Sequence, residues 1–209
     1  MLEKRSFYIN GSWVDPKEQK DIEVINPATE KVCAVISSGS KADVNDAVLA
    51  AKEAFKTWGY STKEERIALL ETFYTLYKKR WNDITDAIIQ EMGAPKDFAS
   101  KLQTGTGASH TKSFIRYLKE FEFEKPLGDH AKNQRLLYEP KGVCALITPW
   151  NWPMNQVCLK VIPALASGCT MILKPSELAP LSAMVLAELI DEAKFPKGVF
   201  NLVNGDGGT

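Results

Sequence analysis

An alternation of strand-like and helix-like segments after residue 142 restricts the possible folds of this chain more than any other feature. Three β-rich runs alternate with two segments of helical spacing, in the order 143–148, 153–167, 169–174, 180–194 and 199–203. Gly168 and Gly198 stand near the two returns from helix to strand. This βαβαβ order predicts the first half of a doubly wound parallel sheet, so residues 141–209 are expected to begin an incomplete dinucleotide-binding domain.

Residues 1–140 have a different organisation, with two β-hairpins followed by helices. A hairpin over residues 7–14 turns at Asn10-Gly11, a pair that suits a type I′ turn, and a second over 22–36 turns at 26–29. Apolar residues over 41–58 keep helical spacing, with Ser40 as the expected N-cap.

The helices continue beyond residue 60. Ser61 and Glu64 form a capping-box signature for a helix that is expected to end at Gly93. Residues 96–121 predict a third helical stretch that glycines interrupt, and residues 122–133 are typical of a connector.

Asn151 stands where the first strand-like run gives way to a helix. Residues 147–153 read Ile-Thr-Pro-Trp-Asn-Trp-Pro, and Pro153 suits a first helical turn because its fixed φ fits there and its missing N–H costs nothing. Open α/β sheets bind ligands beyond the carboxyl ends of their strands. A side-chain amide at this point can donate a hydrogen bond to a developing oxyanion. The alternative is an ordinary turn residue, since asparagine is common in turns.

Lys174 and Glu177 stand at a second junction of the same kind, between the run at 169–174 and a helix expected to start at Pro180. Lysine donates and glutamate accepts hydrogen bonds, so the two together could hold ribose hydroxyls. The glutamate would repel the extra phosphate of NADP, which favours NAD. The alternative is a solvated surface pair that contributes about 0–1 kcal/mol.

The ordered motifs of the chain resemble those of the aldehyde dehydrogenase superfamily. In chain order they are Tyr8-Ile9-Asn10-Gly11-x-Trp13, Asn26-Pro27-Ala28-Thr29, Glu139-Pro140-x-Gly142-Val143, Pro149-Trp150-Asn151, Lys174-Pro175-Ser176-Glu177, Gly198-Val199-Phe200-Asn201 and Gly205-Asp206-Gly207. A single motif such as Gly-Asp-Gly is a weak signal. The ordered set, which covers effectively the whole chain, is specific.

This resemblance implies NAD-dependent oxidation of an aldehyde to a carboxylic acid. In such enzymes a cysteine attacks the aldehyde, hydride passes to NAD and a glutamate activates water. The resemblance makes Asn151 the oxyanion donor. The cofactor-binding residues that it implies are Ile147, Thr148, Pro149 and Trp150 on the nicotinamide side, Lys174 and Glu177 at the adenosine ribose, and Gly207 beside the adenine.

Intact members of the superfamily continue into a general-base glutamate and a nucleophilic cysteine whose motifs do not occur in this sequence. We therefore expect a truncated amino-terminal portion that does not oxidise aldehydes by itself. The four cysteines, Cys33, Cys144, Cys158 and Cys169, are expected to be core residues rather than nucleophiles. By resemblance, the amino-terminal hairpins serve subunit association, and the full-length protein is expected to be a homo-oligomer.

Composition narrows the class of protein further. The chain has 26 Lys and Arg and 26 Asp and Glu, so there is no charge excess that would attract a nucleic acid. No apolar run approaches the roughly 18 residues of a membrane-spanning helix, and the amino terminus does not read as a signal peptide. A cytoplasmic location is expected, and the cysteine and histidine spacing indicates no metal site.

Two other kinds of function compete with the dehydrogenase interpretation. The first is a non-catalytic fragment that binds a dinucleotide or joins full-length subunits. The second is an unrelated βαβ oxidoreductase, which would carry Gly-x-Gly-x-x-Gly after its first strand. Residues 148–153 contain no glycine, which argues against the second alternative.

Overall fold

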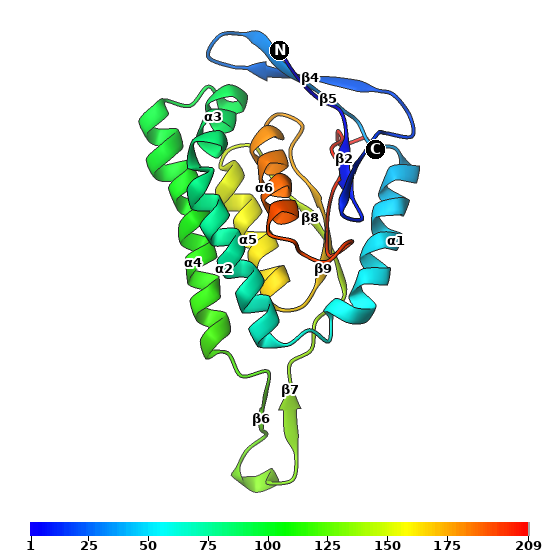
Figure 1. Ribbon diagram of the computed structural model, residues 1–209, viewed down its shortest axis with the longest axis vertical. Coiled ribbons are helices and arrows are strands. Elements are labelled where there is room, and N and C mark those ends of the chain that lie inside the picture. Colours follow the sequence, from blue (N-terminus) through cyan, green and yellow to red (C-terminus); the bar gives the residue numbers. More distant parts are fainter. Residues whose placement is uncertain (209) are drawn as a thin grey trace.

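A computed structural model of the chain, which describes residues 1–208, has a five-stranded sheet at its centre (Figure 1). In sheet order its strands are β3 (Ser12–Val14), β2 (Phe7–Ile9), β10 (Phe200–Leu202), β9 (Thr170–Lys174) and β8 (Val143–Ile147). Strands β8, β9 and β10 are parallel, and helices α5 (Pro153–Ala166) and α6 (Leu181–Glu192) connect them. The predicted βαβαβ unit is confirmed.

Helices cover both faces of this sheet, as a doubly wound fold requires. Helices α5 and α6 pack on one face, and α1 (Lys41–Trp58) lies on the other (Figure 1). Side chains of β9 alternate accordingly: Met171 and Leu173 join the core under α5 and α6, whereas Ile172 packs with residues of α1. The helix predicted over 41–58 is confirmed together with its Ser40 cap.

The hairpin of β2 and β3 belongs to the same sheet, because Tyr8 of β2 pairs antiparallel with Leu202 of β10. Its predicted turn is confirmed, with φ of 52° at Asn10 and 74° at Gly11. The boundary expected at residue 140 therefore divides the chain by sequence but does not divide this sheet.

A second sheet lies at the end of the molecule that carries the amino terminus. It has the order β1-β5-β4, formed by β1 (Leu2–Lys4), β5 (Lys31–Ser37) and β4 (Asp21–Asn26). Strands β4 and β5 are the second predicted hairpin, which is thereby confirmed.

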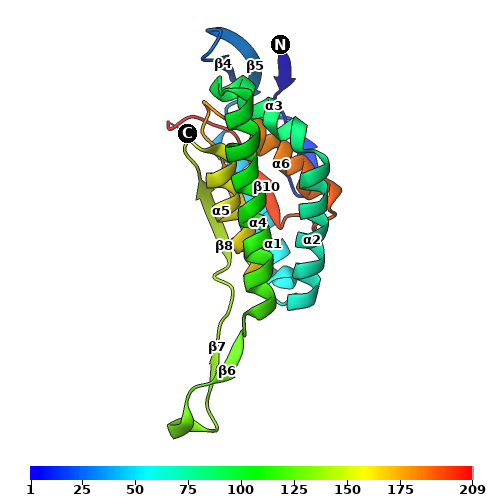
Figure 2. The ribbon, with the colours of Figure 1, turned by 90° about the vertical axis from the view of Figure 1, so that its left-hand side faces the viewer.

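An outer layer of helices packs on α5 and α6 (Figure 2). It consists of α2 (Lys63–Lys79), α3 (Trp81–Met92), the π-helix η1 (Phe98–Thr104) and α4 (Gly105–Glu120). The single helix expected from residue 61 to Gly93 was wrong, because the chain breaks at Arg80. The expected cap was also one residue early, since Thr62 and Glu65 form the capping box of α2.

A narrow hairpin projects from the far end of the molecule (Figures 1 and 2). Its strands are β6 (Glu124–Pro126) and β7 (Arg135–Leu137), and the short 3-10 helix η2 (Asp129–Ala131) lies between them. The segment expected to be a connector over 122–133 thus contains a strand. The polar sequence of β6 includes a proline, which is unfavourable in most strands, so local pattern alone does not predict its pairing with β7.

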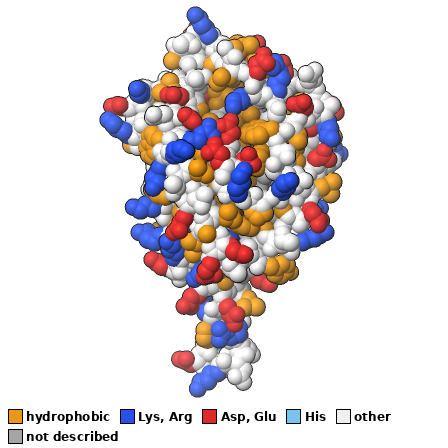
Figure 3. Space-filling view, in the orientation of Figure 1, with side chains coloured by type: hydrophobic (Ala, Val, Ile, Leu, Met, Phe, Trp, Pro, Cys, Tyr) orange, Lys and Arg blue, Asp and Glu red, His pale blue; other side chains and the backbone are white. Residues whose placement is uncertain are grey.

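The distribution of charged side chains on the surface agrees with the balanced charge of the sequence. Acidic and basic side chains intermix on the face shown in Figure 3. Within the described residues, no helix combines the length and apolar character needed to cross a bilayer.

Candidate functional site

The loops that follow β8, β9 and β10 are tied together at the carboxyl ends of the strands. Ile147 lies opposite Lys174 in the parallel register, and the Thr148 N–H donates to the Lys174 carbonyl at 3.2 Å. The Lys174 ammonium donates in turn to the Gly205 carbonyl at 2.6 Å, in the loop after β10. Lys174 therefore joins three loops at the edge of the sheet where ligands of open α/β folds bind.

Lys174 and Glu177 lie side by side at this edge. The Lys174 Nζ is 3.6 Å from the Glu177 Oε2, with side-chain exposures of 29% and 37%. That separation is too long for a direct hydrogen bond. The Lys174 ammonium donates its hydrogen bonds to the carbonyls of Pro175 and Gly205 instead. The Glu177 carboxylate can therefore accept a hydrogen bond from another donor. An exposed ion pair of this kind adds little to the stability of the fold.

Asn151 lies exposed in the loop between β8 and α5. Pro153 begins α5, and the preceding Trp152 has an extended φ of −140° and provides no side-chain cap. The Asn151 side-chain amide has no hydrogen-bond partner among residues 1–208. It is thus free to donate to a ligand in front of the strand ends.

Gln103 is a polar residue beside this loop that sequence patterns did not single out. Its side chain is fully buried, and its Nε2 donates to the Asn151 carbonyl at 3.4 Å. The Gln103 Oε1 is buried without a hydrogen-bond partner. Gln103 lies in the π-helix η1, and π-helical turns occur frequently at functional sites. The glycines at 105 and 107 had indicated an irregular helix here, but not which side chain it presents.

The predicted nicotinamide-side residues occupy the exposed corner next to Asn151. Ile147 is 66% and Trp150 54% exposed, and Pro149 is exposed too, whereas Thr148 is buried. Several exposed apolar side chains together indicate a surface that a ligand or further protein covers. Gly207, the predicted adenine neighbour, lies exposed in the loop after β10, with nothing within 4 Å of where a Cβ would stand.

Two of the four thiols, those of Cys158 and Cys169, are buried, and those of Cys33 and Cys144 are half-buried. Burial raises the pKa of Cys158 to about 12 and that of Cys144 to about 11. Burial also raises the pKa of Cys33, and Cys169 is buried. A raised pKa suppresses the thiolate, which is the nucleophilic form of cysteine. Cys158 and Cys169 are core residues as expected, whereas Cys33 and Cys144 are half-buried and pack against the core.

Glu91 is a buried carboxylate behind the Lys174–Glu177 loop. It accepts hydrogen bonds from the Leu181 N–H and from the N–H and hydroxyl of Ser182, at the start of α6. Burial raises its pKa to about 7, against the opposing effect of these hydrogen bonds. A hollow of about 300 Å³ adjoins it, with Trp150 and Leu178 among its lining residues.

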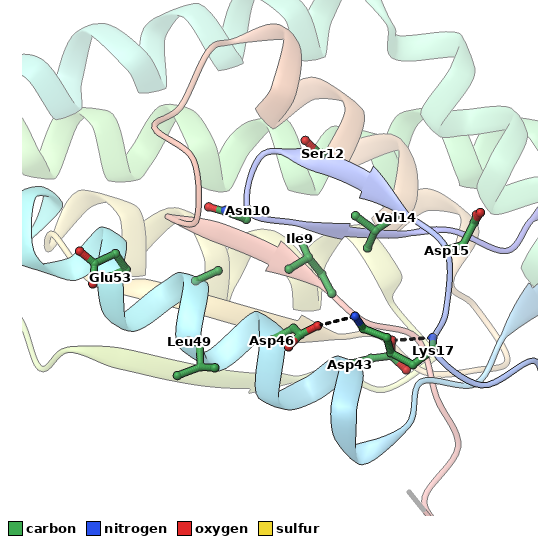
Figure 4. A pocket seen from close by; sticks show the side chains of 11 residues that line it. Ile9, Asn10, Ser12, Val14, Asp15, Lys17, Asp43, Asp46, Leu49 and Glu53 are labelled. Carbon is green, nitrogen blue, oxygen red and sulfur yellow. Dashed lines mark hydrogen bonds and ion pairs between the residues drawn. The ribbon is translucent and has the colours of Figure 1, made fainter.

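A larger depression, of about 560 Å³, lies between the β2–β3 hairpin and α1 (Figure 4). Its charged groups serve the fold: Lys17 pairs with Asp46 at 3.1 Å, and Asp43 accepts from the Lys17 N–H and completes the capping box of α1. The depression lies on the α1 side of the sheet, and no residue of the strand-end loops lines it. It is therefore not a candidate for the same site.

Together, strands β8, β9 and β10 and the helices between them form the first half of a doubly wound α/β fold, with polar groups at the carboxyl ends of its strands. The model of the aldehyde dehydrogenase family matches residues 13–209. The chain belongs to the aldehyde dehydrogenase family.

Curated relatives and solved structures agree with this assignment. A 3-succinoylsemialdehyde-pyridine dehydrogenase of a Pseudomonas species is 50% identical over 99% of this chain and 43% of its own length. The solved structure of an aldehyde dehydrogenase of Bartonella henselae superimposes with a TM-score of 0.98 and 55% sequence identity. The match covers 100% of this chain and 44% of the Bartonella chain.

A mutant of aldehyde dehydrogenase C from Pseudomonas syringae, solved in complex with NAD+ and octanal, has a TM-score of 0.93 and 45% identity over 97% of this chain and 41% of its own. The chain thus spans less than half the length of each of these relatives. The resemblance expected from the motifs is confirmed.

Proposed function

We propose that this chain supplies the amino-terminal part of an NAD-dependent aldehyde dehydrogenase, which oxidises an aldehyde to a carboxylic acid. The junction of three strand-end loops at Lys174 carries this proposal, because it places a cation, a carboxylate and the Asn151 loop at one edge of the sheet. The solved relative with bound NAD+ and octanal supports the same activity.

The polar groups at this edge fit the adenosine ribose of NAD. The Glu177 carboxylate accepts hydrogen bonds and the Lys174 ammonium donates them, so both can bind ribose hydroxyls. The carboxylate disfavours a 2′-phosphate, which selects NAD over NADP. We assign the nicotinamide side to residues 147–150 and the adenine side to Gly207. When bound, NAD supplies the hydride acceptor of the reaction.

Asn151 acts on the substrate in this proposal. Its free side-chain amide donates a hydrogen bond to the oxygen of the aldehyde as negative charge develops there. The nucleophile and the general base come from outside these 209 residues. The raised pKa values of the Cys144 and Cys158 thiols support that division, because neither forms a thiolate readily at neutral pH.

The proposal also covers the substrate class, cellular location and oligomeric state of the complete enzyme. The balanced charge of the chain supports a small-molecule substrate rather than a nucleic acid. We also propose a cytoplasmic location. We propose a homo-oligomer for the complete enzyme.

The test compares the complete enzyme, meaning this chain continued through the rest of the family domain, with purified residues 1–209. Absorbance at the NADH band is followed with octanal as substrate and NAD or NADP as cofactor. We expect NADH formation by the complete enzyme and none by residues 1–209. No NAD-dependent oxidation by the complete enzyme would refute the function, and turnover by residues 1–209 would refute the division of catalytic groups.

The second candidate function is that of a non-catalytic assembly fragment. Among the described residues β8 pairs only with β9, so one edge of β8 offers backbone groups to another strand. Sedimentation of residues 1–209 mixed with the complete enzyme distinguishes the two functions. A stable mixed complex would favour assembly, and independent sedimentation would exclude it.

A further inference from the structure

Two cysteines, Cys144 of β8 and Cys169 directly before β9, lie on the same face of the central sheet. Val143 is opposite Thr170 in the parallel register, so the two cysteines lie diagonally across that pair. Cys169 belongs to the main core cluster, and Cys144 packs against the same cluster. The two thiols share a side-chain hydrogen bond. Their side chains therefore point toward each other, as a disulfide requires.

The backbone around this thiol pair is held in place. The Cys169 N–H donates to the Ala164 carbonyl at 2.9 Å, and the Trp58 Nε1 donates to the Cys169 carbonyl at 3.1 Å. The Thr170 N–H donates to the Gly142 carbonyl at 3.2 Å, just before β8 begins. These hydrogen bonds fix the turn into β9 beside the start of β8, so the fold itself keeps the two thiols together.

The two thiols differ in their access to solvent. Cys144 is half-buried, whereas Cys169 is only 5% exposed. The Ser167 hydroxyl also donates to the Cys169 Sγ at 3.5 Å. A dissolved oxidant can therefore reach Cys144, but Cys169 is accessible chiefly to the neighbouring sulfur of Cys144.

The other two cysteines have different surroundings. A Cβ at Gly107 of α4 would meet the Cys158 Sγ at 3.2 Å, so the Cys158 side chain faces α4. The Cys33 Sγ lies in the second sheet and donates to the Val24 carbonyl at 3.3 Å. The contact between two thiols is thus specific to the β8–β9 pair among the cysteines of the chain.

We propose that Cys144 and Cys169 form a reversible disulfide by exchange with an oxidised small thiol such as oxidised glutathione. The Cys144 thiolate attacks the glutathione disulfide, forms a mixed disulfide and releases one glutathione thiolate. The Cys169 sulfur then attacks the Cys144 sulfur and displaces the second glutathione. The two protein thiols are oxidised and give up two protons, and one oxidised glutathione is reduced to two thiols.

The disulfide would tie together the amino ends of β8 and β9. It would close the loop that contains α5, and such a closure restricts the unfolded chain. The candidate site lies at the opposite, carboxyl ends of these strands, where Ile147 is opposite Lys174. Oxidation is therefore expected to raise the thermal midpoint without changing the strand-end loops. This inference does not depend on the proposed function.

The test incubates the complete enzyme with graded ratios of oxidised to reduced glutathione and then blocks the remaining thiols. Because burial raises the pKa of Cys144 to about 11, the exchange is run at about pH 8.5. Trypsin and chymotrypsin digestion precedes mass spectrometry, since cleavage after Trp150 separates Cys144 from Cys158. We expect a linked pair of peptides containing Cys144 and Cys169, which dithiothreitol separates.

Three serine variants test the order of the steps. Cys169→Ser should remove the link and increase the glutathione adduct on Cys144 at least about tenfold, because no thiol remains to displace it. Cys144→Ser should remove the link and leave Cys169 unmodified. Cys158→Ser is the matched control and should retain the link.

The thermal midpoint supplies a second measurement. It should rise on oxidation in the unsubstituted enzyme and in Cys158→Ser, but not in Cys144→Ser. No linked peptides at the most oxidising ratio, or an equal adduct on Cys144 with and without Cys169, would overturn the inference. A link from Cys144 to a cysteine other than Cys169 would overturn it as well.

Discussion

The Gln103 side chain donates a hydrogen bond across 3.4 Å to the backbone carbonyl of Asn151, which links the π-helix η1 to the exposed loop at the strand ends. The bond holds the peptide group that follows Asn151, so it restrains the direction of the adjacent side-chain amide. Catalytic donors are effective when their position is fixed before the reaction. If Asn151 has the proposed oxyanion role, we expect Gln103 to act as its positioning residue.

Replacing Gln103 by leucine separates this role from a structural one. The Gln103 Oε1 is buried without a partner, so Gln103→Leu removes an unsatisfied atom and should leave the thermal midpoint unchanged or raised. We expect kcat of the complete enzyme to fall about tenfold with little change in the KM for aldehyde. In an Asn151→Ala background the same change should have a smaller effect.

The matched control is Lys101→Leu, at an exposed position of the same π-helix. It should leave kcat within about twofold. A loss of activity that follows a lowered thermal midpoint, or full additivity with Asn151→Ala, would show that Gln103 serves the fold alone.

Asn151→Ala tests the oxyanion role directly. Removal of one oxyanion donor lowers kcat by about 10²- to 10³-fold in well-studied enzymes. We expect a loss of at least about 10²-fold in steady-state kinetics of the complete enzyme, with NAD affinity retained. Asn133→Ala, at an exposed position of the projecting hairpin loop, is the control. An Asn151→Ala enzyme with the original kcat would exclude the role.

Local sequence patterns predicted those helices and hairpins whose ends are marked by a capping residue or a turn sequence. The helix over 41–58 has a Ser40 cap and the first hairpin an Asn10-Gly11 turn, and both form as expected. The next cap was misplaced because residues 61–65 contain two overlapping signatures. Thr62 takes the cap, since the Ser61 hydroxyl donates to the Trp58 carbonyl at the end of α1.

The break at Arg80 could not be predicted from local pattern. The apolar stripe continues through it, but the Arg80 guanidinium binds Glu188 and Glu192 of α6 as well as Asp83. Glu188 and Glu192 are more than 100 residues away from Arg80 in sequence, so a local pattern does not reveal them.

Sequence pattern likewise predicts some residues of the candidate site and misses others. Residues at the ends of consecutive parallel strands must lie at one edge, so Ile147 and Lys174 were predictable neighbours. Gln103 comes from a different helical layer, and no periodicity relates it to Asn151. Its contact with the Asn151 loop depends on tertiary packing.

The buried Glu91 should make stability depend on pH. Burial raises its folded-state pKa to about 7, above the value of an unfolded chain near 4.3, so the folded state binds the proton more tightly. The resulting stabilisation is complete below the unfolded pKa and is lost as pH rises through about 7. We expect the free energy of unfolding, measured by urea titration, to lose about 2–3 kcal/mol of this contribution between pH 4.5 and 7.5.

Glu91→Gln preserves the shape of the side chain and removes the titrating group. Since other carboxylates such as Asp43 have lowered pKa values and act in the opposite sense, the informative quantity is the difference between the two proteins. The unsubstituted chain should lose stability relative to Glu91→Gln as pH rises from 4.5 to 7.5. Parallel stability curves would contradict the assignment.

Cofactor selection provides the most direct test of the central claim, that Lys174 and Glu177 hold the adenosine ribose of NAD. Titration calorimetry of the complete enzyme should give a Kd for NAD at least about tenfold lower than that for NADP. Glu177→Gln should narrow this difference, while Glu120→Gln, at the exposed end of α4, should not. Tighter binding of NADP than of NAD, or a preference that Glu177→Gln leaves unchanged, would contradict the account.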